Sequence, residues 1–239
     1  MKTFLKRPWK TRWKILFVLV LLLIFGFLGL CIYASDYRTL KEEFYDIFQE
    51  ADVYSSSGMI HFQADSEIGL VFYPGGRVEY LAYAPFCQKL QQAGINVFLV
   101  DMPFNMANFG VFKANSVMKD NPEIEEWYLG GHSLGGVAAN MYASSNADKI
   151  SGLILVGIYL SMDYDMEKTI TINGSEDLRV GDSVDYTTNV HVIEGGNHAQ
   201  FGNYGENEGD GIATISTEEQ QNQAVALIAQ FIGNNTNSN

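Results

Sequence analysis

The chain has 239 residues, enough for one domain of ordinary size with an appended segment. Its content of 47% apolar and 18% charged residues excludes an intrinsically disordered chain. The net charge is −13, and all 28 acids lie after residue 34 together with only nine of the 15 basic residues. Phosphate backbones and anionic lipid would repel so acidic a body, which excludes nucleic acid as a partner.

The first part of the sequence predicts a membrane anchor. Residues 15–34 carry no charge, and a helix of this length spans the roughly 30 Å hydrocarbon core of a bilayer. Residues 1–14 hold six basic residues and no acid, so the positive-inside rule places them in the cytoplasm and the body outside. We therefore expect a cytoplasmic basic segment (1–14) and a single-pass signal-anchor helix (15–34) in the cell membrane. Cleavage with secretion, lipidation at Cys31 and a buried helix remain alternatives.

After the anchor, apolar runs alternate with helical patterns. Residues 36–50 have the spacing of a short linking helix. Strands are expected at Met59–Gln63, Ile68–Tyr73, Ile95–Val100, Glu126–Leu129, Ile150–Leu160, Thr169–Ile172 and Val190–Ile193. Helices are expected at Glu79–Ala93, 112–120, Leu134–Ser144 and Glu218–Ile232. This alternation indicates an α/β fold, with a mostly parallel central sheet flanked by helices.

These elements also divide the chain. We place a linker or juxtamembrane helix at 35–57, the α/β domain at 58–233 and a disordered tail at 234–239. In a parallel sheet, functional residues gather in the loops that follow the carboxyl ends of the strands. The chemically informative residues of this sequence all fall in such loops.

A candidate nucleophile lies between the strand near residue 129 and the next helix. Residues 131–135 read Gly-His-Ser-Leu-Gly, the pattern G-x-S-x-G. Glycines on both sides allow the close approach of strand and helix that a sharp turn requires, so that the serine oxygen projects into a cleft. The sequence therefore predicts that Ser133 is a nucleophile, against the alternative of a serine that merely caps the helix.

A serine needs a base that takes its proton, and four histidines are available. His132 adjoins the nucleophile, and we expect its side chain to point away from the pocket. His61 comes before the loops in question, and His191 begins the last strand at the wrong end of the sheet. His198 follows that strand directly, so we expect it to be the base.

The base in turn needs a carboxylate that orients it. Asp177 follows the strand Thr169–Ile172 within Asn-Gly-Ser-Glu-Asp, and the resulting order Ser, Asp, His suits such a triad. Glu176, Asp163 and Asp165 remain rivals for this role.

The negative charge that develops on an attacked carbonyl needs backbone donors. One is expected from the N–H of Leu134, the residue after the nucleophile. The other is expected from the loop Pro74-Gly75-Gly76-Arg77, with Gly76 preferred over its two neighbours. The glycine pair could instead serve only to make a turn.

Between about residues 58 and 232, these motifs resemble the α/β-hydrolase superfamily. The resemblance is to a compact bacterial branch similar to dienelactone hydrolases. It rests on Tyr-Pro-Gly-Gly ending at Gly76, Gly-His-Ser-Leu-Gly around Ser133, Gly-Ser-Glu-Asp ending at Asp177 and Gly-Gly-Asn-His ending at His198. It implies hydrolysis of an ester, lactone or similar acyl bond through an acyl-enzyme, without metal or cofactor. Dienelactone hydrolases have a cysteine nucleophile where this chain has Ser133, so their substrate is not transferred.

The expected strands at Ile150–Leu160 and Thr169–Ile172 are close in sequence, which leaves room for a minimal cap or none and predicts an open cleft. The loop Phe201–Gly211 forms either one wall of the site or a surface connection. Our leading hypothesis is a serine hydrolase of carboxylesterase type that acts on small-molecule acyl substrates. A catalytically silent binding module and an acyltransferase are the alternatives.

Overall fold

The computed structural model describes residues 7–56, 58–180 and 185–236, and the chain divides into two units after Asp36. Helix α1 (Arg7–Ser35) makes up the described part of the first unit. Within it, Lys10–Ser35 is long and apolar enough to cross a membrane, with a mean hydropathy of 3.3 in its most apolar window. The span expected at residues 15–34 lies inside this helix, whereas residues 1–6 of the basic segment lie outside the described residues.

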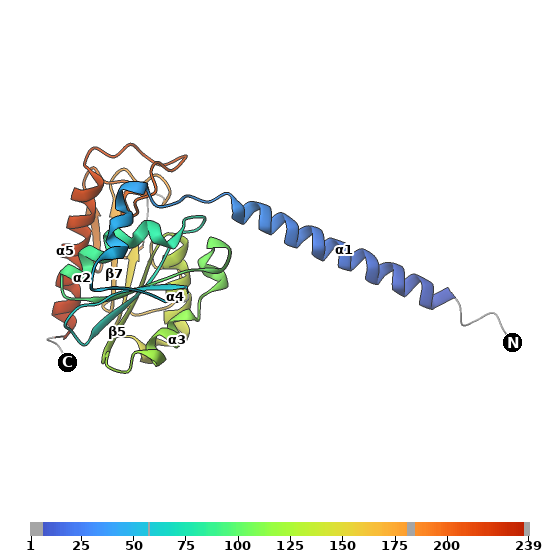
Figure 1. The fold of residues 1–239 in the computed structure, drawn as a ribbon, viewed down its shortest axis with the longest axis horizontal. Helices are drawn as coiled ribbons and strands as arrows, with labels where there is room; N and C mark the ends of the chain where they lie inside the picture. Colours follow the sequence, from blue (N-terminus) through green and yellow to red (C-terminus); the bar gives the residue numbers. More distant parts are fainter. Residues whose placement is uncertain (1–6, 57, 181–184, 237–239) are drawn as a thin grey trace. The chain divides into compact units, whose positions relative to one another are not determined.

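The second unit, Tyr37–Asn239, holds the sheet and the remaining helices (Figure 1). Its strands are β1 (Val53–Ser56), β2 (Met59–Phe62), β3 (Ile68–Tyr73), β4 (Asn96–Val100), β5 (Glu126–His132), β6 (Gly152–Val156), β7 (Thr169–Gly174) and β8 (Val190–Ile193). Its α-helices are α2 (Ala84–Gln92), α3 (Lys113–Asp120), α4 (Leu134–Ser145) and α5 (Thr217–Thr236). Short 3₁₀ helices are η1 (Glu42–Gln49), η2 (Tyr80–Tyr83), η3 (Pro103–Asn105), η4 (Ala107–Phe109), η5 (Ala147–Lys149) and η6 (Ala199–Phe201).

The eight strands form one sheet in the order β1-β2-β4-β3-β5-β6-β7-β8. Strands β1 and β2 are antiparallel, and every pairing from β4 to β8 is parallel. The mostly parallel sheet expected from the sequence is thus confirmed. Strand β6 is shorter than the expected Ile150–Leu160, because the chain turns out of the sheet at Gly157, whose φ is 62°.

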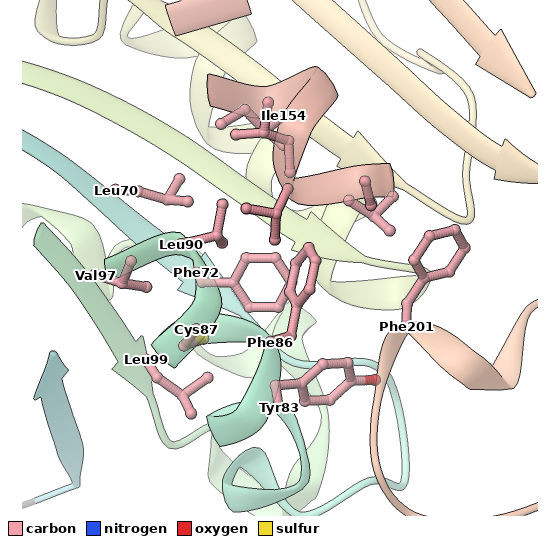
Figure 2. Packing of buried hydrophobic residues seen from close by; sticks show 14 of the residues in the cluster. Leu70, Phe72, Tyr83, Phe86, Cys87, Leu90, Val97, Leu99, Ile154 and Phe201 are labelled. Carbon is pink, nitrogen blue, oxygen red and sulfur yellow. The ribbon is translucent and has the colours of Figure 1, made fainter. Parts of the chain in front are cut away.

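Each face of the sheet carries its own core. On β3, Leu70 and Phe72 pack toward α2 and α5, while Val71 and Tyr73 pack on the opposite face with residues of α3 and α4. This alternation follows from the two-residue period of a strand. Figure 2 shows the first of these cores, with Phe72, Phe86 and Leu90 in close packing. Burial on both faces explains why the strands read as continuous apolar runs.

Of the segment 35–57, expected as a linker or juxtamembrane helix, residues 37–56 contribute to the second unit. Its helix η1 has its apolar side in the core around α2, where Ile47 is buried, and Leu40 joins the same core. Strand β1 then pairs with β2 at the edge of the sheet. The packed domain therefore includes these residues and begins before residue 58.

At the other end of the domain, α5 extends to Thr236, so residues 234–236 of the expected disordered tail are helical. Residues 237–239 lie outside the described residues.

Candidate active site

Ser133 occupies a strained turn between β5 and α4. Its φ is 52° and its ψ is −120°, a conformation that costs a non-glycine residue about 1–3 kcal/mol. The turn is held because the Ser133 N–H donates to the Val156 carbonyl at 2.9 Å. A Cβ on Gly131 would lie 2.8 Å from the Gly136 nitrogen, so only glycine permits this crossing of strand and helix. Ser133 is half-buried, and its backbone adopts the sharp strand-to-helix turn that the G-x-S-x-G pattern predicts.

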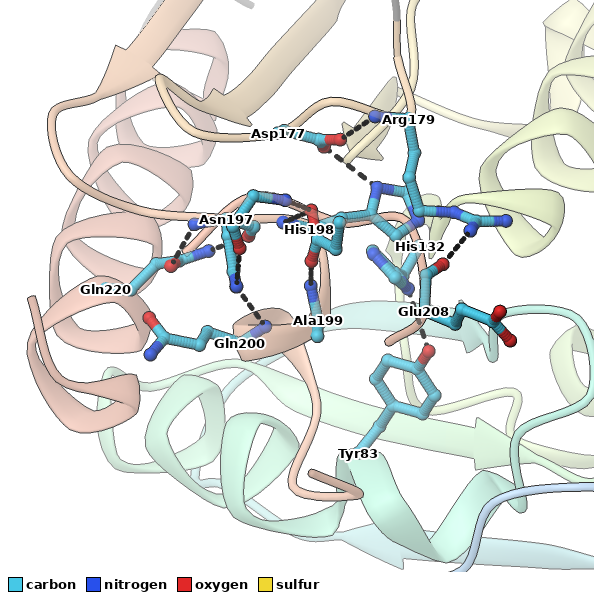
Figure 3. Close-up of polar contacts among 12 residues, drawn as sticks. Tyr83, His132, Asp177, Arg179, Asn197, His198, Ala199, Gln200, Glu208 and Gln220 are labelled. Carbon is cyan, nitrogen blue, oxygen red and sulfur yellow. Dashed lines mark hydrogen bonds and ion pairs between the residues drawn. The ribbon is translucent and has the colours of Figure 1, made fainter. Parts of the chain in front are cut away.

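His198 and Asp177 meet at the carboxyl ends of β8 and β7. The His198 Nδ1 lies 2.8 Å from Asp177 Oδ2, and both side chains are at least 96% buried (Figure 3). Asp177 Oδ1 also accepts the backbone N–H of Arg179 at 2.9 Å, which fixes the carboxylate. With Nδ1 bound to a carboxylate, Nε2 is the ring nitrogen that can exchange a proton with a reacting group.

The histidine also lies beside the turn that holds Ser133. A Cβ built on Gly157 would stand 3.1 Å from His198 Nδ1, and Gly157 directly follows Val156, the acceptor of the Ser133 N–H. Ser133 and His198 therefore both lie at the carboxyl end of β6. The arrangement brings the three residues singled out by the sequence to one edge of the sheet.

The other candidates lie elsewhere or have other partners. Asp163 and Asp165 are exposed, and Asp165 accepts the N–H of Glu167. The Glu176 carboxylate accepts a hydrogen bond from the hydroxyl of its neighbour Ser175. His61 stacks on Phe98 with ring centroids 4.1 Å apart, at the β2–β4 side of the sheet. Among the described carboxylates, Asp177 is the one in contact with the His198 ring.

The two residues expected to supply backbone N–H donors, Gly76 and Leu134, lie against each other. In the loop after β3, Gly75 donates to the Tyr83 hydroxyl at 3.1 Å and Arg77 donates to the Asn105 carbonyl at 2.8 Å. Gly76 lies between them, and within the described part of the chain its N–H has no partner. It lies against Leu134, since a Cβ on Gly76 would approach Leu134 Cδ2 to 2.8 Å. Leu134 opens α4, where first-turn N–H groups have no partner inside the helix.

His132 does not point away from the site, contrary to our expectation. Its ring is buried, with its centroid 4.4 Å from that of His198, and its Nδ1 lies 2.8 Å from the Tyr83 hydroxyl. The Tyr83 hydroxyl also accepts the Gly75 N–H. Tyr83 and His132 therefore connect the Gly75–Gly76 loop with His198. Sequence spacing gave no sign of this contact, because it depends on where η2 packs.

Burial lowers the pKa of His132 well below its usual range, and the neighbouring His198 lowers it further. A histidine that stays neutral when folded but titrates near 6.5 when unfolded makes the unfolded state bind more protons. We therefore expect the free energy of unfolding to decrease as the pH is lowered below about 6.5. This residue contributes about 1.4 kcal/mol per pH unit to the decrease. Urea unfolding of wild type and His132→Gln between pH 5 and 7.5 measures it.

His61 serves as the comparison, because burial lowers its pKa as well while the Asn96 hydrogen bond raises it. Its side chain is less buried, so His61→Gln should flatten the pH dependence less than His132→Gln. Equal slopes for wild type and His132→Gln would contradict a neutral buried His132.

The loop that carries His198 is held by residues that the sequence analysis missed. The Asp210 carboxylate accepts the N–H groups of His198 at 3.2 Å and Ala199 at 2.8 Å. From α5, the buried Gln220 exchanges two hydrogen bonds with the Asn197 backbone, at 2.9 and 2.7 Å (Figure 3). A usable signal was present, since two glutamines, 220 and 221, lie on the buried face of α5, whose other buried residues are apolar. The Phe201–Gly211 segment is thus more than a surface connection, because Asp210 fixes the His198 backbone.

Replacing Asp210 with asparagine is expected to lower the free energy of unfolding by about 1–3 kcal/mol, because one charged acceptor oxygen becomes a donor. If the His198 loop loosens as a result, kcat should fall about tenfold with KM little changed. The matched control is Glu208→Gln in the same loop, since the Glu208 side chain is exposed and only its carbonyl binds Arg179. Equal stability and kcat in both variants would exclude this role for Asp210.

A cavity of about 1020 Å³ lies on the other side of the His198 loop, between η1, α2 and the start of α5. Asn197, Ala199 and Asp210 line it, whereas Ser133 does not. It is therefore separate from the Ser133 turn. Among the described residues, no group of three or more histidines, cysteines or acids is placed to hold a metal ion.

Comparison with known proteins identifies the family of the chain. A family model described as "Alpha/beta hydrolase family" matches residues 69–222, more than half of the chain. The chain therefore belongs to the α/β-hydrolase family. No match was found among curated protein sequences.

Solved structures show the same fold at low sequence identity. A predicted CIB-like hydrolase from Thermoplasma acidophilum has a TM-score of 0.52 and 17% identity, over 74% of this chain and 96% of its own. A monoacylglycerol lipase from Paleococcus ferrophilus has a TM-score of 0.51 and 15% identity, over 75% and 99%. A dienelactone hydrolase from Anabaena variabilis has a TM-score of 0.51 and 15% identity, over 76% and 97%. At these identities the likeness concerns the fold alone.

Proposed function

We propose that the chain is a serine hydrolase that cleaves carboxylic esters through an acyl-enzyme. Ser133 is the nucleophile, His198 the base and Asp177 the carboxylate that orients it. The observation that carries the proposal is the 2.8 Å contact between His198 and Asp177, made beside a serine held at positive φ. Random placement of three polar residues would not produce a buried imidazole–carboxylate pair next to such a turn.

In the proposed reaction, the Ser133 oxygen attacks the ester carbonyl while His198 Nε2 takes the serine proton. Asp177 holds the proton on Nδ1 and stabilises the imidazolium that forms. The N–H groups of Gly76 and Leu134 donate to the oxyanion, and each such donor is typically worth about 3–4 kcal/mol. His198 then protonates the leaving alcohol, and water releases the acyl group from Ser133 by the same steps.

The site is proposed to be open. The segment between β6 and β7, residues 157–168, contains no helix, although it is longer than the sequence analysis expected. With minimal covering at this point, the cleft suits small or surface-accessible acyl substrates. The acyl chemistry of the monoacylglycerol lipase that shares the fold is consistent with an ester substrate.

We further propose that α1 is an uncleaved signal anchor, with its N-terminus in the cytoplasm and the hydrolase unit outside. The length and hydropathy of Lys10–Ser35 support a membrane span, and the basic residues before it support this orientation. Cleavage after this helix, with secretion of the unit, is the alternative.

Turnover of p-nitrophenyl esters of graded acyl length by the full chain tests the function. We expect saturable hydrolysis that includes soluble esters of short and medium acyl groups, since the cleft is open. No turnover of any ester would favour a binding module without activity. Transfer of the acyl group to an added alcohol or amine in excess of hydrolysis would favour an acyltransferase.

A further inference from the structure

Three exposed aromatic side chains gather in the segment between β4 and α3. Phe104, Phe109 and Phe112 are 40%, 49% and 62% exposed, and we name these three residues the aromatic surface. Phe104 and Phe109 pack edge to face with centroids 5.7 Å apart, and Phe112 lies 6.2 Å from Tyr142. Single exposed apolar residues are ordinary, whereas a cluster of large ones marks an interaction surface.

The backbone holds these side chains outward in a defined shape. Phe104 and Asn105 both have positive φ, 59° and 52°, a costly conformation for residues other than glycine. Successive turns connect the segment, including Asn105 N–H to Met102 O at 2.9 Å and Gly110 N–H to Ala107 O at 2.9 Å. The exposure of the aromatic surface therefore results from an ordered loop, at a cost in backbone strain.

The aromatic surface adjoins the proposed oxyanion loop. Asn105, next to Phe104, accepts the N–H of Arg77 at 2.8 Å, and Arg77 follows Gly76. Both segments follow the carboxyl ends of neighbouring parallel strands, β3 and β4. A partner that binds the aromatic surface would therefore lie at the same edge of the sheet as Ser133.

The segment that carries the aromatic surface has no net charge, which permits contact with a lipid bilayer. Residues 101–120 contain two lysines and two aspartates and so have no net charge, whereas the chain carries −13. Lys119 is exposed, and Lys113 binds the Asp101 carbonyl at 2.6 Å. This segment therefore adds nothing to the repulsion between the acidic body and phosphate headgroups, and aromatic rings favour the interface between headgroups and acyl chains.

We propose that the aromatic surface inserts into the interface of a lipid bilayer, so that the site receives acyl esters from that bilayer. The inference rests on the proposed ester hydrolysis and on α1 as a membrane anchor. The substrate class that follows is an ester of a lipid acyl chain held at the membrane surface. Insertion itself requires no turnover and can be measured separately.

Quenching by brominated lipid tests the insertion. The full chain with Phe109→Trp is reconstituted in phosphatidylcholine vesicles with and without brominated acyl chains, and the wild-type emission of Trp9, Trp13 and Trp127 is subtracted. The control is Tyr54→Trp, at an exposed position on edge strand β1. We expect brominated lipid to lower the added emission of Phe109→Trp at least twofold and to leave that of Tyr54→Trp unchanged.

Equal quenching at both positions, or none at Phe109→Trp, would overturn the proposal. Quenching of Phe109→Trp by a soluble brominated ester but not by brominated lipid would also overturn it, and would assign the surface to the substrate alone. The same measurement in the Ser133→Ala background should give the expected quenching, because insertion needs no turnover. A failure of the insertion proposal is thus distinguished from a failure of the proposed ester hydrolysis.

A second measurement tests the consequence for the substrate. In Phe109→Ser/Phe112→Ser, the ratio of turnover on a vesicle-embedded ester to turnover on a soluble ester should fall at least fivefold. Tyr54→Ser should leave this ratio at the wild-type value. An unchanged ratio in the double variant would contradict delivery of substrate from the bilayer.

Discussion

Replacing Ser133 with alanine is expected to lower kcat/KM for a carboxylic ester by about 10⁴-fold or more. The alanine keeps the turn between β5 and α4 but removes the oxygen that is proposed to form the acyl-enzyme. His198, Asp177 and the two N–H donors remain, so a small residual rate over water should persist. KM for the ester should change far less than kcat, because the binding surface is intact.

The matched control is Ser144→Ala, which removes an exposed hydroxyl at the end of α4 that binds the Met141 carbonyl. This variant should keep wild-type kcat/KM and a similar free energy of unfolding. Turnover by Ser133→Ala within tenfold of wild type, with both proteins folded by circular dichroism, would rule out Ser133 as the nucleophile.

Replacing Asp177 with asparagine is expected to lower kcat by about 10⁴-fold. An amide can still accept the Arg179 N–H, so the turn should survive. It can also donate to His198 Nδ1, which would move the ring proton to Nε2 and leave no lone pair to take the serine proton. The loss should therefore appear in kcat and in the pH profile rather than in KM.

Asp163→Asn is the comparison, because Asp163 was a rival for the same role and its side chain is exposed. It should leave kcat unchanged. If Asp163→Asn loses activity and Asp177→Asn keeps it, the acid has been assigned to the wrong strand end, and the contact between Asp177 and His198 serves only to hold the loop.

Local patterns were sufficient for much of this fold. Strands such as β3 and β4 are apolar on both faces, and the pattern alone indicates a parallel sheet. The turn at Ser133 could be predicted because it needs glycines at fixed offsets. The proximity of Asp177 and His198 followed from topology, since adjacent parallel strands end at the same edge.

The features that were missed depend on packing between distant segments. The direction of His132 is set by Tyr83, 49 positions earlier, which reaches it only after η2 packs on the sheet. The short helix η1 looked like a linker because its apolar residues suit any amphipathic helix, and only the core around α2 defines what they cover. In the sequence, nothing distinguishes Asp210 from the other acids of this polar loop. Its contact with the His198 backbone depends on how the loop folds.

The proposed function depends above all on Ser133 as an activated nucleophile, and a fluorophosphonate tests this directly. The folded full chain is treated with the probe and digested, and the modified peptide is identified by mass spectrometry. We expect one covalent adduct, on Ser133, formed by native protein and lost after unfolding in urea or in Asp177→Asn. Absence of an adduct on native protein, or an adduct on a different residue, would contradict the proposal.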